Sequence, residues 1–443
     1  MSLTISVIGT GYLGVVHAAC MTDLGHTVIA LDSDTAKIES LAAGRPPIFE
    51  PGLDELLLRA LASGRLRFTT DYAELAGADV HFVCVGTPQR RGENAADTSY
   101  VFSAAHSLAP QLSSEALVVG KSTVPVGTAA RMRVRLQAGA PEGVLARLAW
   151  NPEFLREGFA IRDTVAPDRF VYGVDGPTAE ADVVLLDRVY AAPLATGTPR
   201  IVADYPTAEL VKAAANSFLA TKISFINAMS EVCEAAGADV AQLADAIGYD
   251  DRIGRRYLNA GIGFGGGCLP KDIRAFMARA GELGADQAVT FLREVDAINL
   301  RLRSRLVDLA RDQCGGSLIG KRVAVLGAAF KPDSDDIRDS PALDIAEAAR
   351  RGGALVTCFD PKAMGKARIV HPELSYAESV EDACRDADVV LHLTEWEQFR
   401  EIDPALLKAI VATPSIIDGR NALDPVRWRG AGWTYRALGR PRT

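Results

Sequence analysis

Residues 3–32 read LTISVIGTGYLGVVHAACMTDLGHTVIALD. An apolar run ends in a glycine-rich turn, an alanine-rich run follows, and a second apolar run ends in an acid, Asp32. This order predicts strand, turn, helix and strand, which is how a doubly wound parallel sheet begins. The turn is a GxGxxG pattern made of Gly9, Thr10, Gly11, Tyr12, Leu13 and Gly14.

The turn predicts a dinucleotide site. Gly9 would make the tight turn, Gly11 would let the backbone meet a pyrophosphate at the helix N-terminus, and Gly14 would allow close packing. Asp32 follows at the end of the next strand, where its carboxylate is suited to accept hydrogen bonds from the adenosine ribose. Because Asp32 would repel a 2′-phosphate and no arginine follows it directly, we expect NAD rather than NADP. A nucleotide-free Rossmann turn is the alternative.

The same order returns near the C-terminus, in residues 322–360. Gly9 precedes Asp32 by 23 residues, whereas Gly327 precedes Asp360 by 33, and the added ten lie at the position of the glycine turn. The second copy is therefore expected to have exchanged its dinucleotide turn for the polar loop FKPDSDDIRDSP.

The segment 207–236, between the two copies, holds no Gly or Pro and is rich in Ala, Leu, Ile and Glu, which predicts one long helix. A helix this long needs a packing partner, for which a second copy of the chain is a candidate. We expect an α/β protein with two Rossmann-like, doubly wound parallel-sheet domains joined by a long central helix and a helical middle domain. The expected boundaries are 1–203, 204–314 and 315–443.

Composition narrows the class of protein. The chain has 443 residues, 48% hydrophobic and 23% charged, which is typical of a folded globular protein. A net charge of −8 without long single-sign blocks argues against a nucleic-acid partner. The N-terminus lacks a signal-peptide pattern and no apolar run is long enough to span a membrane, so we expect a cytoplasmic protein without a membrane partner. Seven cysteines without CxxC pairs fit a reduced compartment, and we expect no metal site.

The segment GIGFGGGCLPKD, residues 261–272, presents Cys268 after five glycines. Pro270 suits the first turn of a helix, which would leave Cys268 at the positive end of that helix with Lys271 beside it. Both features favour a nucleophilic thiolate, whereas a buried apolar cysteine is the alternative. A dehydrogenase cofactor combined with a reactive thiol points to oxidation through a thiohemiacetal to a thioester, followed by hydrolysis to an acid.

Two further pairs of residues are candidates. Lys212 and Asn216 are spaced i, i+4 on the long helix and so share one face, where they can present donors to an oxyanion. Glu153 and Glu157 lie in NPEFLREG, a segment without an amphipathic pattern. The alternative for each is an ordinary solvated surface residue.

The motifs GTGYLG, KSTVPVGT, NPEFLREGFA, GFGGGCLPKD and LGAAFKPDSDDIRDSP, with the long helix, resemble the UDP-glucose/GDP-mannose dehydrogenase family over essentially the whole chain. The resemblance implies an NAD-binding N-terminal domain, a dimerising central helix and a C-terminal domain for the nucleotide sugar, in a homodimer or higher homo-oligomer. It also implies that two NAD molecules act in succession to oxidise the sugar C6 alcohol to an acid. UDP-glucose is the expected substrate, because DDRIGRRYLNAGIGFGGGC is similar to the segment before the nucleophile in members that use it. The alternatives are GDP-mannose or another nucleotide sugar, a two-electron dehydrogenase of the 6-phosphogluconate type, and a non-catalytic nucleotide sensor.

The resemblance also implies roles for residues at matching positions. Cys268 would be the nucleophile, and Glu153 would assist thioester hydrolysis. Lys212 and Asn216 would polarise the C6 oxygen, while Asp272 and Thr123 would position a proton-accepting water. The implied cofactor-binding residues are Gly9, Gly11, Tyr12, Leu13, Gly14, Asp32, Lys37, Thr87, Pro88, Thr123, Glu157, Lys271 and Arg338. The implied substrate-binding residues are Glu153, Phe154, Leu155, Lys212, Asn216, Arg252 (reaching a neighbouring subunit), Tyr257, Phe264, Gly265, Phe330, Lys331 and Arg420. Gly267 departs from the family pattern, in which serine is common before the cysteine.

Overall fold

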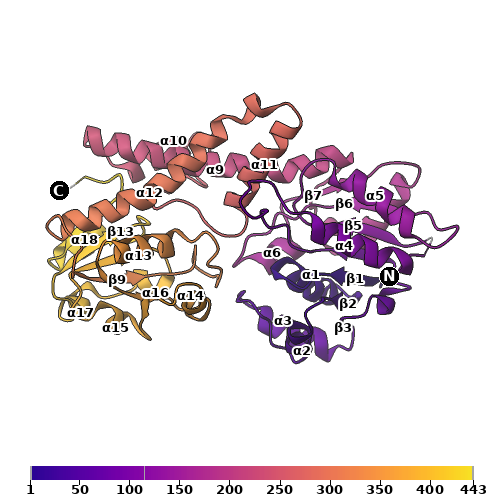
Figure 1. Ribbon diagram of the computed structural model, residues 1–443, viewed down its shortest axis with the longest axis horizontal. Coiled ribbons are helices and arrows are strands. Elements are labelled where there is room, and N and C mark those ends of the chain that lie inside the picture. Colours follow the sequence, from indigo (N-terminus) through magenta and orange to yellow (C-terminus); the bar gives the residue numbers. More distant parts are fainter. Residues whose placement is uncertain (1, 114, 442–443) are drawn as a thin grey trace. The chain divides into compact units, whose positions relative to one another are not determined.

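The computed structural model describes residues 2–113 and 115–441, which form two compact units (Figure 1). Unit 1 comprises the chain up to Ala215 together with Arg274–Gly284. Unit 2 comprises Asn216–Ile273 and the chain from Ala285 onward. The expected middle domain, 204–314, is thus divided between the two units, and the three-domain boundaries stay a proposal about sequence organisation.

Unit 1 is built on an eight-stranded sheet with the order β3-β2-β1-β4-β5-β6-β7-β8. The first six strands follow the Rossmann order, which reverses direction between β1 and β4. The strands are β1 (Thr4–Ile8), β2 (Thr27–Leu31), β3 (Leu66–Thr69), β4 (Val80–Val83), β5 (Leu117–Gly120), β6 (Arg147–Trp150), β7 (Phe170–Gly173) and β8 (Arg200–Ala203).

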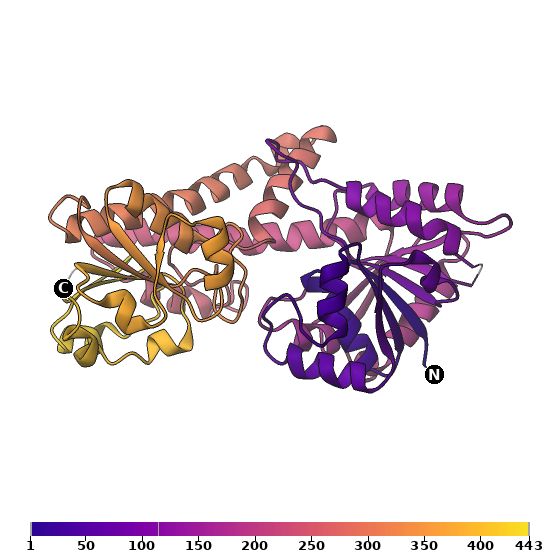
Figure 2. The same ribbon diagram turned by 60° about the horizontal axis from the view of Figure 1, so that its bottom comes forward.

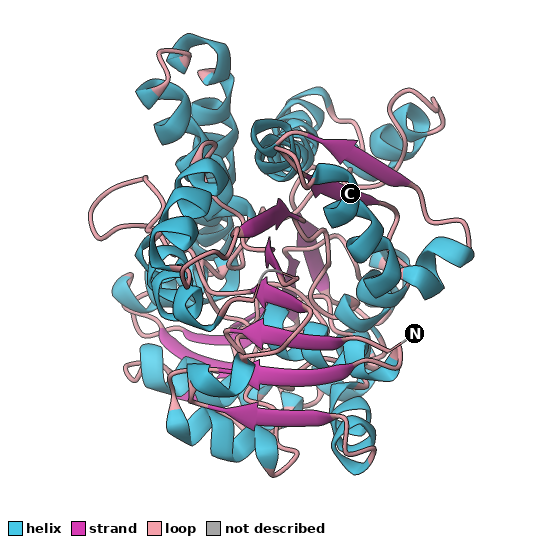
Figure 3. Cartoon of the chain, turned by 90° about the vertical axis from the view of Figure 1, so that its right-hand side faces the viewer, coloured by secondary structure: helices cyan, strands magenta, loops and turns pink. Residues whose placement is uncertain are grey.

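Helices cover both faces of this sheet, as Figure 3 shows. Side chains alternate along each strand, so that Val7 and Phe82 join one apolar cluster while Ile8 and Val83 join the other. The helices are α1 (Tyr12–Asp23), α2 (Thr35–Ala42), α3 (Leu53–Ala62), α4 (Ser99–Leu108), α5 (Thr128–Gly139), α6 (Ala160–Val165), α7 (Ala179–Val189) and α8 (Ala191–Ala195), with 3-10 turns η1 (Tyr72–Leu75) and η2 (Ala109–Gln111).

One strand pairing differs from a uniformly parallel sheet. β7 lies antiparallel to β6 and joins it through the single pair Trp150↔Gly173, while β7 and β8 are parallel. The chain that leaves β6 therefore re-enters the sheet from the same carboxyl edge, without a full crossover. As a result, the connection 151–169, which contains Glu153, starts and ends at the edge where Rossmann folds bind their ligands.

Unit 2 repeats the Rossmann order in a six-stranded, wholly parallel sheet, β11-β10-β9-β12-β13-β14. Its strands are the orange and yellow arrows in Figure 2. The repeated order confirms the internal repeat predicted from the sequence, and residues 327–340 form the loop that stands in place of the glycine turn. The strands are β9 (Arg322–Leu326), β10 (Leu355–Phe359), β11 (Ser375–Tyr376), β12 (Val389–His392), β13 (Ser415–Asp418) and β14 (Thr434–Ala437). The helices are α13 (Pro341–Arg351), α14 (Met364–Val370), α15 (Val380–Cys384), α16 (Glu397–Arg400), α17 (Pro404–Lys408) and α18 (Pro425–Gly430).

The predicted long helix is confirmed as α9 (Tyr205–Ala236), which has 32 residues. It starts where the Asp204 carboxylate accepts a hydrogen bond from the Thr207 N–H at 2.8 Å, a common N-terminal cap. The remaining elements are α10 (Val240–Gly248), α11 (Leu269–Glu282), η3 (Asp286–Val289) and α12 (Phe291–Gln313). Within the described ranges, none of these helices, nor any other, combines the length and apolar character needed to cross a bilayer.

Candidate active site

The glycine turn of unit 1 has the geometry of a phosphate-binding turn. Gly9 has a φ of 92°, and a Cβ on Gly14 would lie 1.8 Å from the Gly9 carbonyl oxygen, so packing of the chain itself requires both glycines. A Cβ on Gly11 would meet no atom of the chain within 4 Å. Gly11 is therefore the position at which the backbone is open to a ligand, as the dinucleotide pattern predicts.

The first turn of α1 supplies donors beside Gly11. The first helical hydrogen bond runs from the Val15 N–H to the Gly11 carbonyl at 3.0 Å, so the N–H groups of Tyr12, Leu13 and Gly14 have no intrahelical acceptor. The Tyr12 phenol itself donates to Glu50, and burial together with Glu50 raises the pKa of Tyr12. This helix end fits the pyrophosphate of NAD through its backbone.

Asp32 lies at the end of β2 and is held as a carboxylate. Its Oδ2 accepts hydrogen bonds from the Thr10 N–H at 2.8 Å, the Thr10 hydroxyl at 2.9 Å and the Lys37 ammonium at 2.9 Å. Partial burial alone would raise the pKa of Asp32, but these bonds and one from the Asp34 N–H outweigh it and lower the pKa. Among the described residues, Oδ1 accepts only the Asp34 N–H at 3.1 Å, and 11% of the side chain is exposed, which leaves capacity for a ribose hydroxyl.

The matching acid of unit 2, Asp360, has no such capacity. Its Oδ2 accepts hydrogen bonds from the Ala328 N–H, the Ala329 N–H and the Trp396 indole, and its Oδ1 accepts two further backbone N–H groups. The residue is 1% exposed. Asp360 therefore fixes the turn of its own domain, and of these two matching acids Asp32 is the one that keeps an open acceptor.

Two loops of unit 1 meet beside the turn. The Thr87 hydroxyl donates to the Thr123 carbonyl at 2.7 Å, and the Ser122 hydroxyl donates to the Val85 carbonyl at 2.6 Å. The carbonyl of Pro88 accepts a hydrogen bond from the Asp97 N–H at 2.7 Å. The predicted residues Thr87, Pro88 and Thr123 thus lie on joined loops after β4 and β5.

Four predicted residues of unit 1 come together around a buried ion pair. The Lys212 ammonium lies 3.1 Å from Glu153 Oε1, and both side chains are largely buried. Glu153 Oε2 accepts a hydrogen bond from the Leu155 N–H at 2.7 Å. Lys212 also lies 5.7 Å from the centre of the Phe154 ring, within reach of a cation–π contact. Glu157, further along the same loop, is buried.

Cys268 directly precedes α11, as the sequence predicts. Its carbonyl accepts the hydrogen bond of the Asp272 N–H at 3.0 Å, which places the residue at the N-cap of the helix. Among the seven cysteines, all of them within the described ranges, Cys268 is exposed, Cys314 is intermediate and the other five are buried. The helix N-terminus favours a thiolate at this exposed position.

Asp272, one turn into α11, is buried and doubly bound. It accepts a hydrogen bond from the Asn216 side chain at 2.7 Å and pairs with the Lys271 ammonium. Asn216 lies one turn after Lys212 on α9, so the predicted shared face of that helix is confirmed.

The glycines before Cys268 pack against unit 2 itself. A Cβ on Gly265 would lie 2.3 Å from the Asp339 carbonyl oxygen, and one on Gly266 would lie 2.7 Å from the Phe330 ring. A Cβ on Gly267 would lie 2.2 Å from the Arg338 guanidinium carbon, so the family's serine would displace that side chain. Close packing of the chain thus requires glycine at these three positions.

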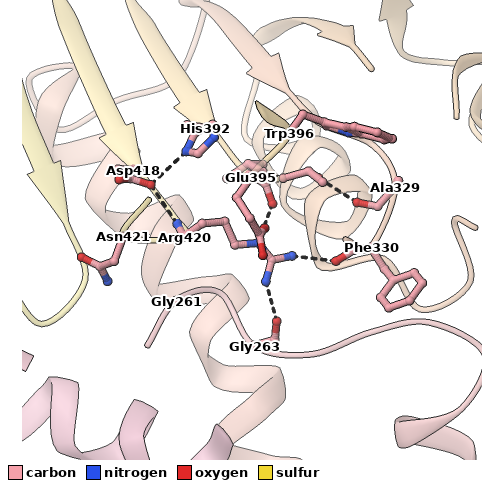
Figure 4. A network of polar contacts seen from close by, with 12 residues as sticks. Gly261, Gly263, Ala329, Phe330, His392, Glu395, Trp396, Asp418, Arg420 and Asn421 are labelled. Atoms are coloured by element: carbon pink, nitrogen blue, oxygen red, sulfur yellow. Dashed lines mark hydrogen bonds and ion pairs between the residues drawn. The ribbon is translucent and has the colours of Figure 1, made fainter. Parts of the chain in front are cut away.

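Arg420 joins three loops of unit 2, as Figure 4 shows. Its guanidinium donates to the carbonyls of Leu393 at 2.8 Å, Gly263 at 2.8 Å and Phe330 at 2.9 Å. Its backbone N–H donates to Asp418, which also pairs with the buried His392. Three of the five guanidinium N–H donors are used in these bonds, so Arg420 orders the glycine-rich segment 261–267 that precedes Cys268. Its contact with substrate stays a prediction.

The other predicted residues are dispersed over unit 2. Lys331 lies 5.7 Å from the Phe330 ring, and Asn299 holds both backbone groups of Phe264. Tyr257 has a φ of 66°, which is costly for a non-glycine residue and common at functional sites. Arg252 and Arg338 are exposed and pair with Asp250 and Asp336, respectively.

Sequence reasoning missed Glu50 and Lys121, two buried charged residues beside the predicted site residues of unit 1. Glu50 accepts hydrogen bonds from Tyr12, from the Gly158 N–H at 2.6 Å and from the Ala160 N–H at 2.7 Å, and so ties the glycine turn to the loop after β6. No local pattern marks it. Lys121 follows β5, and a cation directly after an apolar strand was the signal that could have found it.

The fold and the turn define unit 1 as the nucleotide domain of a dinucleotide-dependent dehydrogenase. Three family models match the chain: UDP-glucose/GDP-mannose dehydrogenase family, NAD binding domain over residues 3–193, central domain over 206–301 and UDP binding domain over 324–425. The chain belongs to the UDP-glucose/GDP-mannose dehydrogenase family, and its cofactor is NAD.

Individual relatives agree with the family models. A UDP-glucose 6-dehydrogenase of Rhizobium meliloti (strain 1021) is 41% identical over 440 residues, covering 99% of this chain and 100% of that relative. The structure of a UDP-glucose dehydrogenase from Pyrobaculum islandicum matches with a TM-score of 0.90 and 38% identity, covering 99% and 98% of the two chains. A UDP-D-ManNAc dehydrogenase from Pyrococcus horikoshii matches with a TM-score of 0.85 and 26% identity, covering 100% of both chains.

Proposed function

We propose that this chain oxidises UDP-glucose at C6 to UDP-glucuronate, with Cys268 as the nucleophile. The observation that carries the proposal is the exposed thiol of Cys268 at the N-terminus of α11, in a chain with an NAD-binding turn. The similarity to UDP-glucose 6-dehydrogenases supports the choice of sugar.

NAD, when bound, accepts one hydride in each of two oxidations, so two molecules are consumed. In the first oxidation the C6 alcohol loses a proton and a hydride and becomes an aldehyde. The Cys268 thiolate then adds to the aldehyde carbon, the oxygen takes a proton, and the resulting thiohemiacetal loses a proton and the second hydride to give a thioester. Water adds to the acyl carbon, the carbon–sulfur bond breaks, the thiol regains a proton and the sugar acid leaves.

The other predicted catalytic residues stabilise developing charge or assist proton transfer in these steps. Lys212 and Asn216 donate to the C6 oxygen as negative charge develops on it. Asp272 and Thr123 hold the water that takes up protons, and Glu153 promotes attack of water on the thioester. Lys212 is paired with Glu153, and Asn216 is bound to Asp272, so each donor is already held by an acid.

The test is an assay of the purified enzyme for NADH with UDP-glucose, GDP-mannose and UDP-N-acetylmannosamine as separate substrates. We expect two NADH per UDP-glucose, a sugar acid detected by mass spectrometry, and a much lower kcat/KM for the other two. A higher kcat/KM for GDP-mannose, or one NADH per sugar with an aldehyde product, contradicts the proposal.

We also propose that the chain forms a homodimer through α9 and works in the cytoplasm. Phe218, Phe225 and Val232 follow each other at intervals of seven on one face of α9 and are 66%, 49% and 57% exposed. A second copy of the same helix would cover this apolar stripe. Light scattering of the wild type and of Phe225→Glu measures the mass, and a wild-type monomer contradicts the dimer. The six cysteines other than Cys268 are free thiols, as expected where thiols stay reduced.

A further inference from the structure

Lys121 is a buried cation that the proposed mechanism does not use. It directly follows β5, is 7% exposed, and makes no ion pair with a carboxylate in the described part of the chain. Its ammonium instead lies 5.8 Å from the centres of the Phe82 and Tyr190 rings. A lysine is rarely buried without a paired acid because desolvation is costly, so a positive charge at this point needs a reason.

The ammonium holds one side chain in particular, the amide of Asn151. Lys121 donates to Asn151 Oδ1 at 3.1 Å and lies 3.4 Å from the Tyr190 hydroxyl, which itself donates to the same Oδ1 at 2.8 Å. The other end of the amide donates to the Val171 carbonyl on β7 at 3.0 Å. Asn151 thus bridges β6 and β7 at the junction where the ladder has a single residue pair.

This bridge lies at the base of two predicted catalytic segments. Glu153 follows Asn151 by two residues, and Thr123 follows Lys121 by two residues. Because a single residue pair joins β6 to β7, the Asn151 amide adds a polar tie across this junction, beside the bond from the Asn151 N–H to the Gly120 carbonyl at 2.8 Å.

Several titratable groups face Lys121. They are Cys84 after β4, Glu153 after β6, Lys212 on α9 and His17 on α1. Burial, opposed by Cys84 and Glu153 and assisted by Lys212, lowers the pKa of Lys121 to about 8. Burial lowers the pKa of His17 well below its ordinary value, so His17 is neutral and adds no charge.

We propose that the Lys121 ammonium is a positioning residue for thioester hydrolysis: it holds Asn151, and through it Glu153, in the conformation that pairs with Lys212. This role rests on the proposed function of Glu153.

The sign of the pH effect on hydrolysis follows from the charge of Lys121. Lys121 is charged and holds the amide as a cation below about pH 8, and this contribution is lost as the pH rises through that value.

The experiment compares Lys121→Met with the wild type, and uses Lys408→Met, which removes an exposed lysine on α17, as the matched control. Each enzyme is mixed with UDP-glucose and NAD, and intact-mass spectrometry follows the acyl group on Cys268. We expect Lys121→Met to hydrolyse the acyl-enzyme about tenfold or more slowly at pH 7 and to slow its formation less, because only hydrolysis uses Glu153 directly. The ratio of wild-type to variant hydrolysis rates should fall toward one above about pH 9, where most wild-type Lys121 is neutral.

Asn151→Leu, which keeps the size of the side chain without the amide, provides a second test of the proposal if Lys121→Met does not fold. It is expected to slow hydrolysis more than acylation. Wild-type hydrolysis rates in both variants, equal slowing of acylation and hydrolysis, or a rate ratio that does not change with pH overturns the proposal. A wild-type enzyme that forms no acyl-enzyme from UDP-glucose instead overturns the proposed function itself.

Discussion

Glu153 and Lys212 form a buried ion pair, with 3.1 Å between carboxylate and ammonium. The two residues belong to distant parts of the sequence, a loop after β6 and the first third of α9, and sequence reasoning gave them different tasks. Because removing one member of a buried pair leaves the other charge uncompensated, their roles are coupled. A variant of Glu153 therefore also changes the environment of the cation expected at the C6 oxygen.

Replacing Glu153 by glutamine is expected to stall the reaction after both oxidations. Glutamine keeps the shape of the side chain but cannot act as a base, so the thioester should accumulate on Cys268. Intact-mass spectrometry during turnover measures it, with Glu142→Gln, an exposed glutamate, as the control. An unmodified Cys268 in Glu153→Gln during slow turnover contradicts the assigned role.

The exposure of Cys268 predicts selective alkylation. Iodoacetamide should modify Cys268 first, because five of the other six cysteines are buried and Cys314 is only intermediate. Labelling followed by peptide mass spectrometry tests this, and UDP-glucose should protect the thiol.

Cys268→Ser should lose acid production and keep NAD binding, whereas Cys314→Ser should keep both. Acid formation by Cys268→Ser at the wild-type rate would exclude the covalent route.

The two matching aspartates predict opposite phenotypes. Asp32→Asn should weaken NAD binding and reduce the preference of kcat/KM for NAD over NADP, because the negative charge that opposes a 2′-phosphate is lost. Asp360→Asn should leave that preference unchanged and lower the free energy of unfolding by about 1–3 kcal/mol, since an amide nitrogen would face N–H donors. Cofactor kinetics and chemical denaturation of both variants measure the contrast. A cofactor ratio unmoved by Asp32→Asn would show that Asp32 does not contact the ribose.

The close approach of Gly267 to Arg338 predicts that a methyl group added at residue 267 takes effect by displacing the Arg338 side chain. Gly267→Ala should push the flexible Arg338 guanidinium out of its contact with Asp336 at little cost in stability. If Arg338 contacts NAD, Gly267→Ala and Arg338→Ala should raise the Kd for NAD to the same extent. Gly365→Ala, on α14 with no atom near its added Cβ, is the control. Calorimetric titration with NAD measures this Kd. An unchanged Kd in both variants would show that Arg338 does not contact NAD.

Short-range sequence patterns were sufficient to predict much of the fold of this protein. The glycine turn, the uninterrupted helix of residues 207–236 and the repeated strand order could be predicted because each depends on neighbouring residues: glycine spacing, helix propensity, and alternation of apolar runs with turns. The position of Cys268 before a helix followed in the same way from Pro270. The family resemblance added roles to these positions.

What only the tertiary structure decided depends on contacts between residues far apart in the chain. Asp32 and Asp360 end similar strands, yet one keeps an open acceptor and the other is saturated by donors from three separate segments. The glycines before Cys268 are required by groups about seventy residues later. Lys121 reads as a polar residue after a strand, and only folding places its charge against Asn151 and two aromatic rings. Burial and hydrogen-bond saturation are properties of the packed chain, so no local pattern specifies which acid remains available to a ligand.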